Sequence, residues 1–254
     1  VSMALQKHRY KDYWTRTETY ESLRIYINMN YGGLHDAIKS LVAGETIEVD
    51  TSSFQNDMTT FANRDDVLTL LVHLGYLGYL SENHSVYIPN KEIRHEFLTC
   101  IKNDKIWNST IAALNLSQDI LKYTLSQNSE KVAEIIEQIH RTETAPIHYN
   151  DEHSLRYVVL LSYFYAREKY NIIQEMPAGD GYADIMLVPN FQNPDGIPII
   201  IELKCNESPE TAINQIKGKH YYDALKDYNS VLLVGISYNR KTKKHDCLIE
   251  KFDM

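Results

Sequence analysis

The stretch Ile199-Ile200-Ile201-Glu202-Leu203-Lys204 decides how the second half of this 254-residue chain is interpreted. Three consecutive isoleucines are typical of a strand that is buried inside a sheet. In a strand, Glu202 and Lys204 point to one face and Leu203 points to the other. Burying a charge without a partner is costly, so a carboxylate and an ammonium group at the end of a core strand need an explanation. That explanation is either a simple ion pair or a bound metal.

Asp184 supplies a third charged group on another apolar run, residues 182–188. If this run pairs antiparallel with the isoleucine strand around the polar loop at 190–196, Asp184 lies beside Glu202. Two adjacent carboxylates repel each other, and a divalent cation removes that repulsion. Mg²⁺ prefers one or two carboxylates together with waters and phosphate oxygens. The set therefore suits metal-dependent hydrolysis of a phosphodiester, with the lysine orienting the attacking water or stabilising the developing charge.

The pattern around these strands predicts an α/β (α+β) domain with a mixed sheet. The order is helix, strand, strand, strand, helix, strand, and the second helix is the natural crossover between two parallel strands. The expected elements are a helix at 151–170, a strand at 172–174, a turn at 177–181, strands at 182–188 and 199–205, a helix capped by Ser208 from Pro209 to about 228, a strand at 231–238 and an edge strand at 247–252.

The first half of the chain has mainly helical spacing. Helices are expected at 18–28, 34–42 and 64–74, the last with Asn63 as its amino-terminal cap, and another begins after Pro89-Asn90. A short strand at 46–49 and a hairpin around 79–88 complete a module that resembles a winged-helix arrangement. We therefore expect a winged-helix-like module at 1–103, a helical connector at 104–145 and the strand-rich domain at 146–254.

Asp184 followed by Glu202-Leu203-Lys204 resembles the signature of the PD-(D/E)XK nuclease superfamily, an Asp and then (Asp/Glu)-x-Lys after a variable gap. The resemblance covers about residues 145–252 and implies an αβββαβ, restriction-endonuclease-like core. It also implies that Mg²⁺ or Mn²⁺ is held by Asp184, Glu202 and the carbonyl of Leu203. The sequence departs from the superfamily at Ala183, because the first Asp often follows a Pro.

The same resemblance implies supporting residues outside the two strands. Gln215 matches a Gln that is often functional on the helix after the third strand, and Lys219 lies one turn further on that helix. Either Tyr221 or Tyr222 fits the next position, and the sequence does not choose between them. Glu152 resembles an acid that completes the metal site, although an acid near the start of a helix also has a purely electrostatic explanation. Glu175 is a further candidate, with a turn as its alternative.

Two stretches, Gly179-Asp180-Gly181-Tyr182-Ala183-Asp184-Ile185 and Ala212-Ile213-Asn214-Gln215-Ile216-Lys217-Gly218-Lys219-His220-Tyr221, resemble the branch that is fused to divergent AAA-type ATPase domains in bacterial proteins. The hairpin that ends in Val86-Tyr87-Ile88-Pro89-Asn90 resembles the region that joins the two parts. The ATPase-associated resemblance of the amino-terminal part covers about residues 10–100 and is weaker than the nuclease resemblance. It implies a linked ATPase domain that this chain lacks, because no G-x-x-x-x-G-K-[ST] motif is present.

The formal net charge of −8 argues against a protein whose whole surface binds nucleic acid. A nuclease needs only a local basic strip. One candidate strip is Lys217 with Lys219, and the other contains Arg240, Lys241, Lys243 and Lys244. Each strip has an equally good explanation as a solvated face or turn.

Several features indicate the compartment. The three cysteines are far apart and form no C-x-x-C pair, which indicates neither a zinc ribbon nor a disulfide framework and suits a reducing cytosol. The longest apolar runs are far shorter than the roughly 20 residues that cross a bilayer. A cytoplasmic protein without a membrane contact is therefore expected. No secretory signal opens the chain and its first residue is Val, so we expect a piece of a longer polypeptide.

Two functions are compatible with these residues. The first is a Mg²⁺- or Mn²⁺-dependent nuclease that acts on DNA, with Asp184, Glu202, Lys204 and Gln215 as its catalytic residues. The second is a non-catalytic module that binds nucleic acid or a protein, such as a linked ATPase domain or a second copy of the chain. In a third hypothesis, Glu202 and Lys204 form no more than a buried ion pair.

Overall fold

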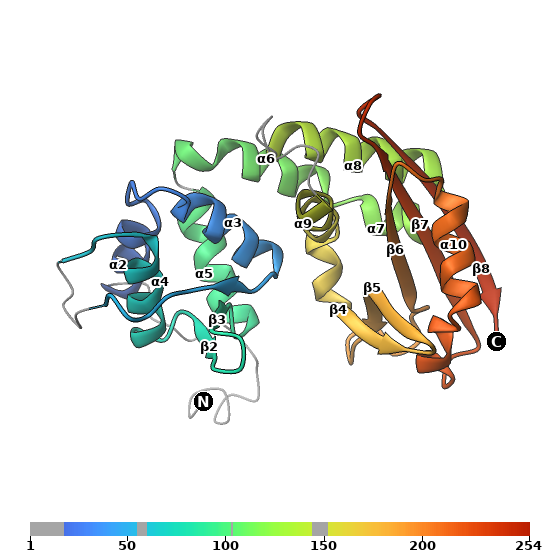
Figure 1. The fold of residues 1–254 in the computed structure, drawn as a ribbon, viewed down its shortest axis with the longest axis horizontal. Helices are drawn as coiled ribbons and strands as arrows, with labels where there is room; N and C mark the ends of the chain where they lie inside the picture. Colours follow the sequence, from blue (N-terminus) through green and yellow to red (C-terminus); the bar gives the residue numbers. More distant parts are fainter. Residues whose placement is uncertain (1–17, 55–59, 103, 144–151) are drawn as a thin grey trace. The chain divides into compact units, whose positions relative to one another are not determined.

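The computed structural model describes residues 18–54, 60–102, 104–143 and 152–254 (Figure 1). The chain divides into two compact units, residues 1–111 and 112–254. The expected three-part division stays a prediction, and its second boundary, at 145/146, falls outside the described residues.

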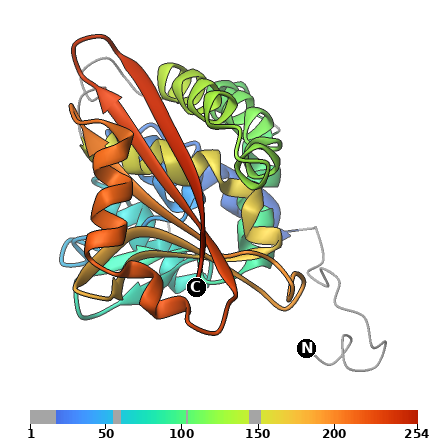
Figure 2. The same cartoon turned by 90° about the vertical axis from the view of Figure 1, so that its right-hand side faces the viewer.

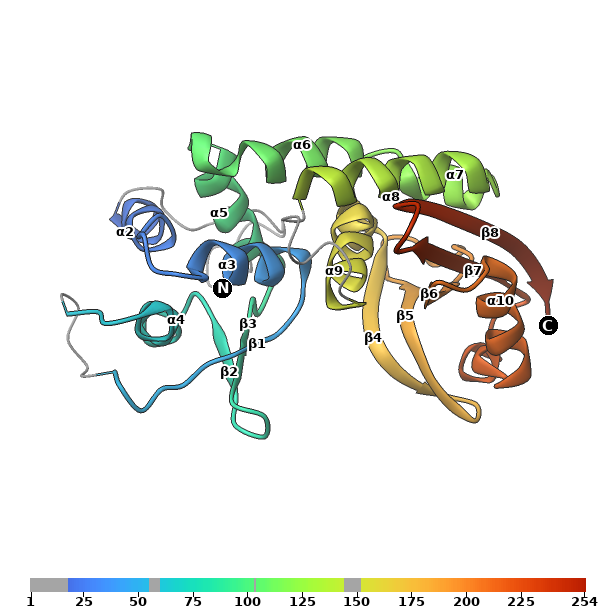
Figure 3. The ribbon, with the colours of Figure 1, turned by 45° about the horizontal axis from the view of Figure 1, so that its top comes forward.

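The first unit combines helices with a small sheet. Its sheet has the order β1-β3-β2, with both neighbouring pairs antiparallel (Figure 3). The Asn63 side chain accepts hydrogen bonds from the amides of Asp65 and Asp66, which confirms the expected cap. The winged-helix resemblance stays a prediction. The described elements are α2 (Glu18–Ile27), α3 (Leu34–Ala43), β1 (Ile47–Glu48), α4 (Arg64–His73), β2 (Gly78–Leu80), β3 (Ser85–Tyr87), α5 (Lys91–Lys102) and η1 (Lys105–Trp107), followed by α6 (Asn108–Leu116) at the division between the units.

The second unit is built on a five-stranded mixed sheet with the order β4-β5-β6-β7-β8. Only the β6–β7 pair is parallel, and α10 is the crossover that joins these two strands, as the sequence predicts. The fold is therefore consistent with a restriction-endonuclease-like core. The elements are α7 (Ile120–Leu125), α8 (Ser129–Glu143), α9 (Glu152–Ser162), η2 (Phe164–Glu168), β4 (Tyr170–Ala178), β5 (Gly181–Pro189), β6 (Ile199–Cys205), α10 (Pro209–Gly218), η3 (Tyr221–Leu225), β7 (Ser230–Asn239) and β8 (Lys244–Asp253).

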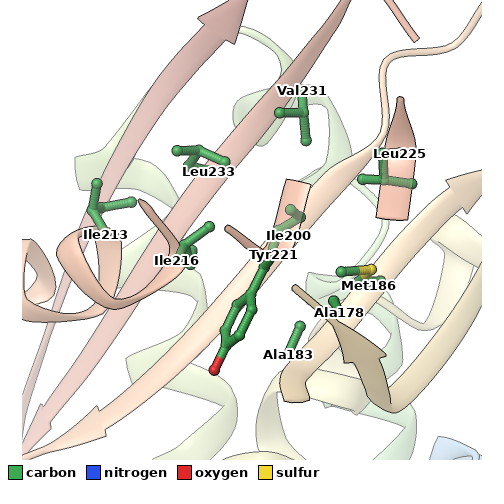
Figure 4. Packing of buried hydrophobic residues seen from close by; sticks show 10 residues of the cluster. All are labelled: Ala178, Ala183, Met186, Ile200, Ile213, Ile216, Tyr221, Leu225, Val231 and Leu233. Carbon is green, nitrogen blue, oxygen red and sulfur yellow. The ribbon is translucent and has the colours of Figure 1, made fainter. Parts of the chain in front are cut away.

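Helices cover both faces of this sheet, with α10 on one side and α8 and α9 on the other (Figure 2). Alternate residues of the central strands therefore meet different helices. The core beneath α10 contains apolar side chains from α10, from η3 and from strands β4, β5, β6 and β7 (Figure 4). Its members are Ala178, Ala183, Met186, Ile200, Ile213, Ile216, Tyr221, Leu225, Val231 and Leu233.

Two helices are shorter than the sequence predicts. The helix expected at 151–170 ends at Ser162 and continues as the 3₁₀ helix η2. This change follows buried Tyr163, whose hydroxyl lies 2.7 Å from that of Thr124. The helix expected to reach 228 ends at Gly218, because the amide of Asp180 donates to the Lys219 carbonyl at 2.8 Å. That carbonyl is therefore bonded to the β4–β5 turn, and the chain leaves α-helical geometry at His220, where φ is 52°.

Other local predictions need correction as well. Strand β4 covers Tyr170–Ala178 and is much longer than expected, and the turn is confined to Gly179 and Asp180. Pro177 lies inside the strand, paired with Tyr182. An edge strand tolerates this proline, because the missing amide can face away from the sheet. Ser208 precedes α10 but its side chain makes no capping hydrogen bond.

In the described part of the chain, no helix is both long and apolar enough to cross a membrane.

Candidate active site

The site forms where β5 and β6 stop pairing. Their antiparallel ladder pairs Leu187 with Ile199 and ends with Ile185 opposite Ile201. One step further in the same register, Asp184 is the counterpart of Glu202. The ladder does not continue there, because the Asp184 carboxylate accepts the amide hydrogen of Leu203 at 2.8 Å. The opening between two core strands thus holds a half-buried carboxylate, fixed by the backbone.

Glu202 is the most deeply buried acid of the site, with 2% of its surface exposed. Its Oε1 accepts hydrogen bonds from Lys204 Nζ at 2.9 Å and from Gln215 Nε2. No described donor stands in normal hydrogen-bond geometry to Oε2, which is also buried. Burial and the neighbouring Asp184 carboxylate together raise the pKa of Glu202 to about 7, against the opposing effect of Lys204.

Lys204 points to the same face as Glu202, as strand geometry requires. Its side chain is 16% exposed and forms an ion pair with Glu202. The ion pair of the third hypothesis therefore exists. It leaves Glu202 Oε2 with no described donor in normal hydrogen-bond geometry, and burial together with Asp184 keeps the pKa of Glu202 raised despite the lysine.

Gln215 connects the strand acids to the next segment of the chain. Its Nε2 donates to Glu202 and to the hydroxyl of Tyr221, the latter at 3.1 Å. Tyr221 is 2% exposed, so the geometry selects it over Tyr222 as the tyrosine near the site. Tyr222 instead stacks on Phe252, with ring centroids 4.5 Å apart.

The candidate basic residues lie outside this cluster. Lys219 is exposed, and Lys217 pairs with Glu250 on β8 at 2.6 Å. Of the second basic strip, Arg240, Lys241 and Lys243 lie in the turn between β7 and β8, and Lys244 begins β8. Glu152 is the first residue of α9, but its side chain is outside the described part of the structure.

Glu175 lies within β4, where the sequence also allowed a turn. Its carboxylate accepts a hydrogen bond from Arg156 of α9. Sequence reasoning missed Arg156. The available signal was its spacing, since it follows Glu152 by four residues on the same helix.

The donor set can be tested against a divalent metal from the chemistry of its oxygens. Among the described residues, no three or more His, Cys, Asp or Glu side chains are grouped so that they could hold a metal. The two acids of the site, one with a buried oxygen that lacks a donor, offer hard oxygen ligands of the kind that Mg²⁺ and Mn²⁺ prefer. A site with few protein ligands fits Mg²⁺ in particular, because this ion keeps several of its waters. The residues therefore fit such an ion.

A comparison with protein families gives a match to part of the chain. Residues 150–246 match the PD-(D/E)XK nuclease superfamily. The matched segment runs from the start of α9 to the first residues of β8, and it contains Asp184, Glu202, Lys204 and Gln215. A search of curated proteins found no significant match. This part of the second unit is thus similar to the PD-(D/E)XK nuclease superfamily, and its sheet order and crossover helix are consistent with a restriction-endonuclease-like core.

Proposed function

We propose that this nuclease-like domain hydrolyses phosphodiester bonds of nucleic acid, with DNA as the first substrate to test and Mg²⁺ or Mn²⁺ as the cofactor. The observation that supports this most strongly is Glu202. Its buried carboxylate has one oxygen with no described donor in normal hydrogen-bond geometry, and it lies next to a second acid, which is the arrangement expected where a cation binds. The family match agrees with this reaction class.

Each residue has a defined part in the proposed reaction. Asp184, Glu202 and the Leu203 carbonyl would hold the metal, with Glu152 as a further ligand. The bound ion supplies a lowered pKa for a coordinated water and positive charge next to the phosphate. Lys204 orients the attacking water or stabilises the developing negative charge. Gln215 fixes the Glu202 carboxylate through the hydrogen bond to Oε1.

A cleavage assay tests this assignment. Wild-type protein and the variants Asp184→Ala and Lys204→Ala are incubated with linear and circular DNA and with RNA, in Mg²⁺, in Mn²⁺ and in chelator. Wild type should cleave only with metal, and each variant should lose at least about 100-fold in rate. Asp195→Asn is the matched control, because Asp195 is an exposed acid in the β5–β6 loop. Equal cleavage by wild type and both variants would remove the catalytic assignment.

A second function is favoured by the closed Glu202–Lys204 ion pair and by the net charge of −8. In this alternative the domain binds nucleic acid or a protein without cleaving it. The first unit, as a winged-helix-like module, would bind a linked ATPase domain or a second copy of the chain. Titration with Mn²⁺ separates the two functions. Binding that is lost in Glu202→Ala counts against a purely structural role for the acid.

A further inference from the structure

Glu175 has an unusual backbone conformation at the level of the site. Its φ is 48°, in the left-handed region that non-glycine residues rarely adopt. The residues on either side pair normally with β5, Gln174 with Ile185 and Met176 with Ala183. The register makes Asp184 the counterpart of Glu175, yet these two residues form no ladder pair. Strained conformations of this kind persist where the surrounding structure holds them, and they are common at functional sites.

The contact that holds Glu175 comes from α9. Arg156 Nη1 donates to Glu175 Oε1, with the Arg156 side chain 23% exposed and the Glu175 side chain 61% exposed. Exposed ion pairs contribute little to folding stability. The Arg156–Glu175 ion pair instead has a geometric consequence. It joins the second turn of α9 to the position of β4 opposite Asp184.

We propose that the Arg156–Glu175 ion pair is a positioning device for the metal site, and this inference rests on the function proposed above. The pair fixes the beginning of α9 at the level of Asp184 in the sheet. Glu152, the first residue of that helix and a candidate metal ligand, precedes Arg156 by one helical turn. Neither Arg156 nor Glu175 is assigned contact with substrate or metal. They act through α9 and through strand β4, which borders the Asp184 strand.

The test measures metal affinity in the full chain, apart from any cleavage. Mn²⁺ is titrated calorimetrically into wild type, Glu175→Gln, Arg156→Gln and the charge-swapped double variant Arg156→Glu/Glu175→Arg. Residues that orient metal ligands typically change affinity by 10–100-fold, so each single variant should bind Mn²⁺ about tenfold more weakly. The swap restores the attraction between the two positions and should recover most of the affinity. Glutamine and arginine meet the same backbone restriction as glutamate at position 175.

Two further measurements separate positioning from general damage. Amide hydrogen exchange of the metal-free protein should accelerate in the first turns of α9 in the single variants, while their thermal midpoints stay at the wild-type value. Glu250→Gln is the matched control, because Lys217–Glu250 also links a helix to a strand, but on β8. This control should bind Mn²⁺ like wild type.

The outcomes distinguish this inference from the proposed function. If wild type binds Mn²⁺ and both single variants bind it equally well, the ion pair has no positioning role, although the nuclease proposal stands. A charge swap that remains as weak as the single variants also overturns the positioning role. If wild type neither binds Mn²⁺ nor cleaves nucleic acid, both proposals fall.

Discussion

At the scale of single residues, Glu202 is under two opposing influences. It lies at the end of an isoleucine strand, where burial disfavours its ionised form, and it faces Asp184, whose negative charge disfavours that form further. Lys204 and Gln215 donate to only one of its oxygens. A cation that binds both acids would favour the ionised carboxylate, so the site combines a preference for protonation with a capacity for metal.

This conflict predicts a pH-dependent metal affinity. The pKa of Glu202 is raised to about 7, so below neutral pH the carboxyl group holds a proton that metal must displace. Mn²⁺ affinity should therefore rise by up to about tenfold per pH unit between roughly pH 5.5 and 7 and level off above that range. Calorimetry in buffers of different ionisation enthalpy should detect close to one released proton at the acidic end. An affinity that is constant across this range would contradict the assigned protonation.

At the scale of secondary structure, the end of α10 is fixed by the hairpin between β4 and β5. The Asp180 amide donates to the Lys219 carbonyl, and Gly179 turns the chain with a φ of 51°. A Cβ atom at position 179 would collide with the carbonyl oxygens of Lys219 and His220. The close approach also brings Tyr221 under Gln215, so the turn contributes to the geometry around Glu202.

Replacing Gly179 tests this docking. Gly179→Ala combines a disfavoured positive φ with a backbone clash, and it should lower the free energy of unfolding by about 2–3 kcal/mol in urea titrations. Gly218→Ala is the matched control in the last position of α10, where the added Cβ meets no atom within 4 Å beyond its chain neighbours and the backbone of its own helix. It should change stability by less than about 1 kcal/mol. Equal effects of the two substitutions would show that the turn does not depend on Gly179.

The elements that the sequence predicts best are those whose own residues determine them. The isoleucines of β6, the apolar run of β7 and Pro209 at the start of α10 define the parallel pair and its crossover, and both are confirmed. The predicted end of α10 is wrong, because the helix is ended by a hydrogen bond from the amide of residue 180, which is far away in sequence. The strand predicted at 172–174 is shorter than β4, because buried and exposed residues alternate along an exposed edge strand and leave no continuous apolar run. The Arg156–Glu175 contact depends on tertiary structure in the same way.

At the scale of the whole molecule, the second compact unit begins at residue 112 and includes α8. Helix α8 packs on β8 and on α9, and its Val132, Ile136 and Ile139 are fully buried. His140 of α8 also meets His245 of β8, with ring nitrogens 2.8 Å apart. The helix therefore behaves as part of the layer that covers this side of the sheet.

Two truncated chains test where the domain begins. Residues 112–254 contain the complete compact unit and should show one cooperative urea transition by circular dichroism. Residues 146–254 lack α8 and leave an apolar face of the sheet uncovered, so this shorter chain should aggregate or unfold without cooperativity. A cooperative, monomeric 146–254 fragment would support the boundary that the sequence suggests and contradict a structural role for α8.

The most direct measurement of the central claim is anomalous diffraction from a crystal of the full chain soaked in Mn²⁺. The account predicts an anomalous peak between the carboxylates of Asp184 and Glu202, within coordination distance of both, and its loss in Glu202→Ala. A soak at a Mn²⁺ concentration that supports cleavage, with no peak at these two acids, would contradict the account.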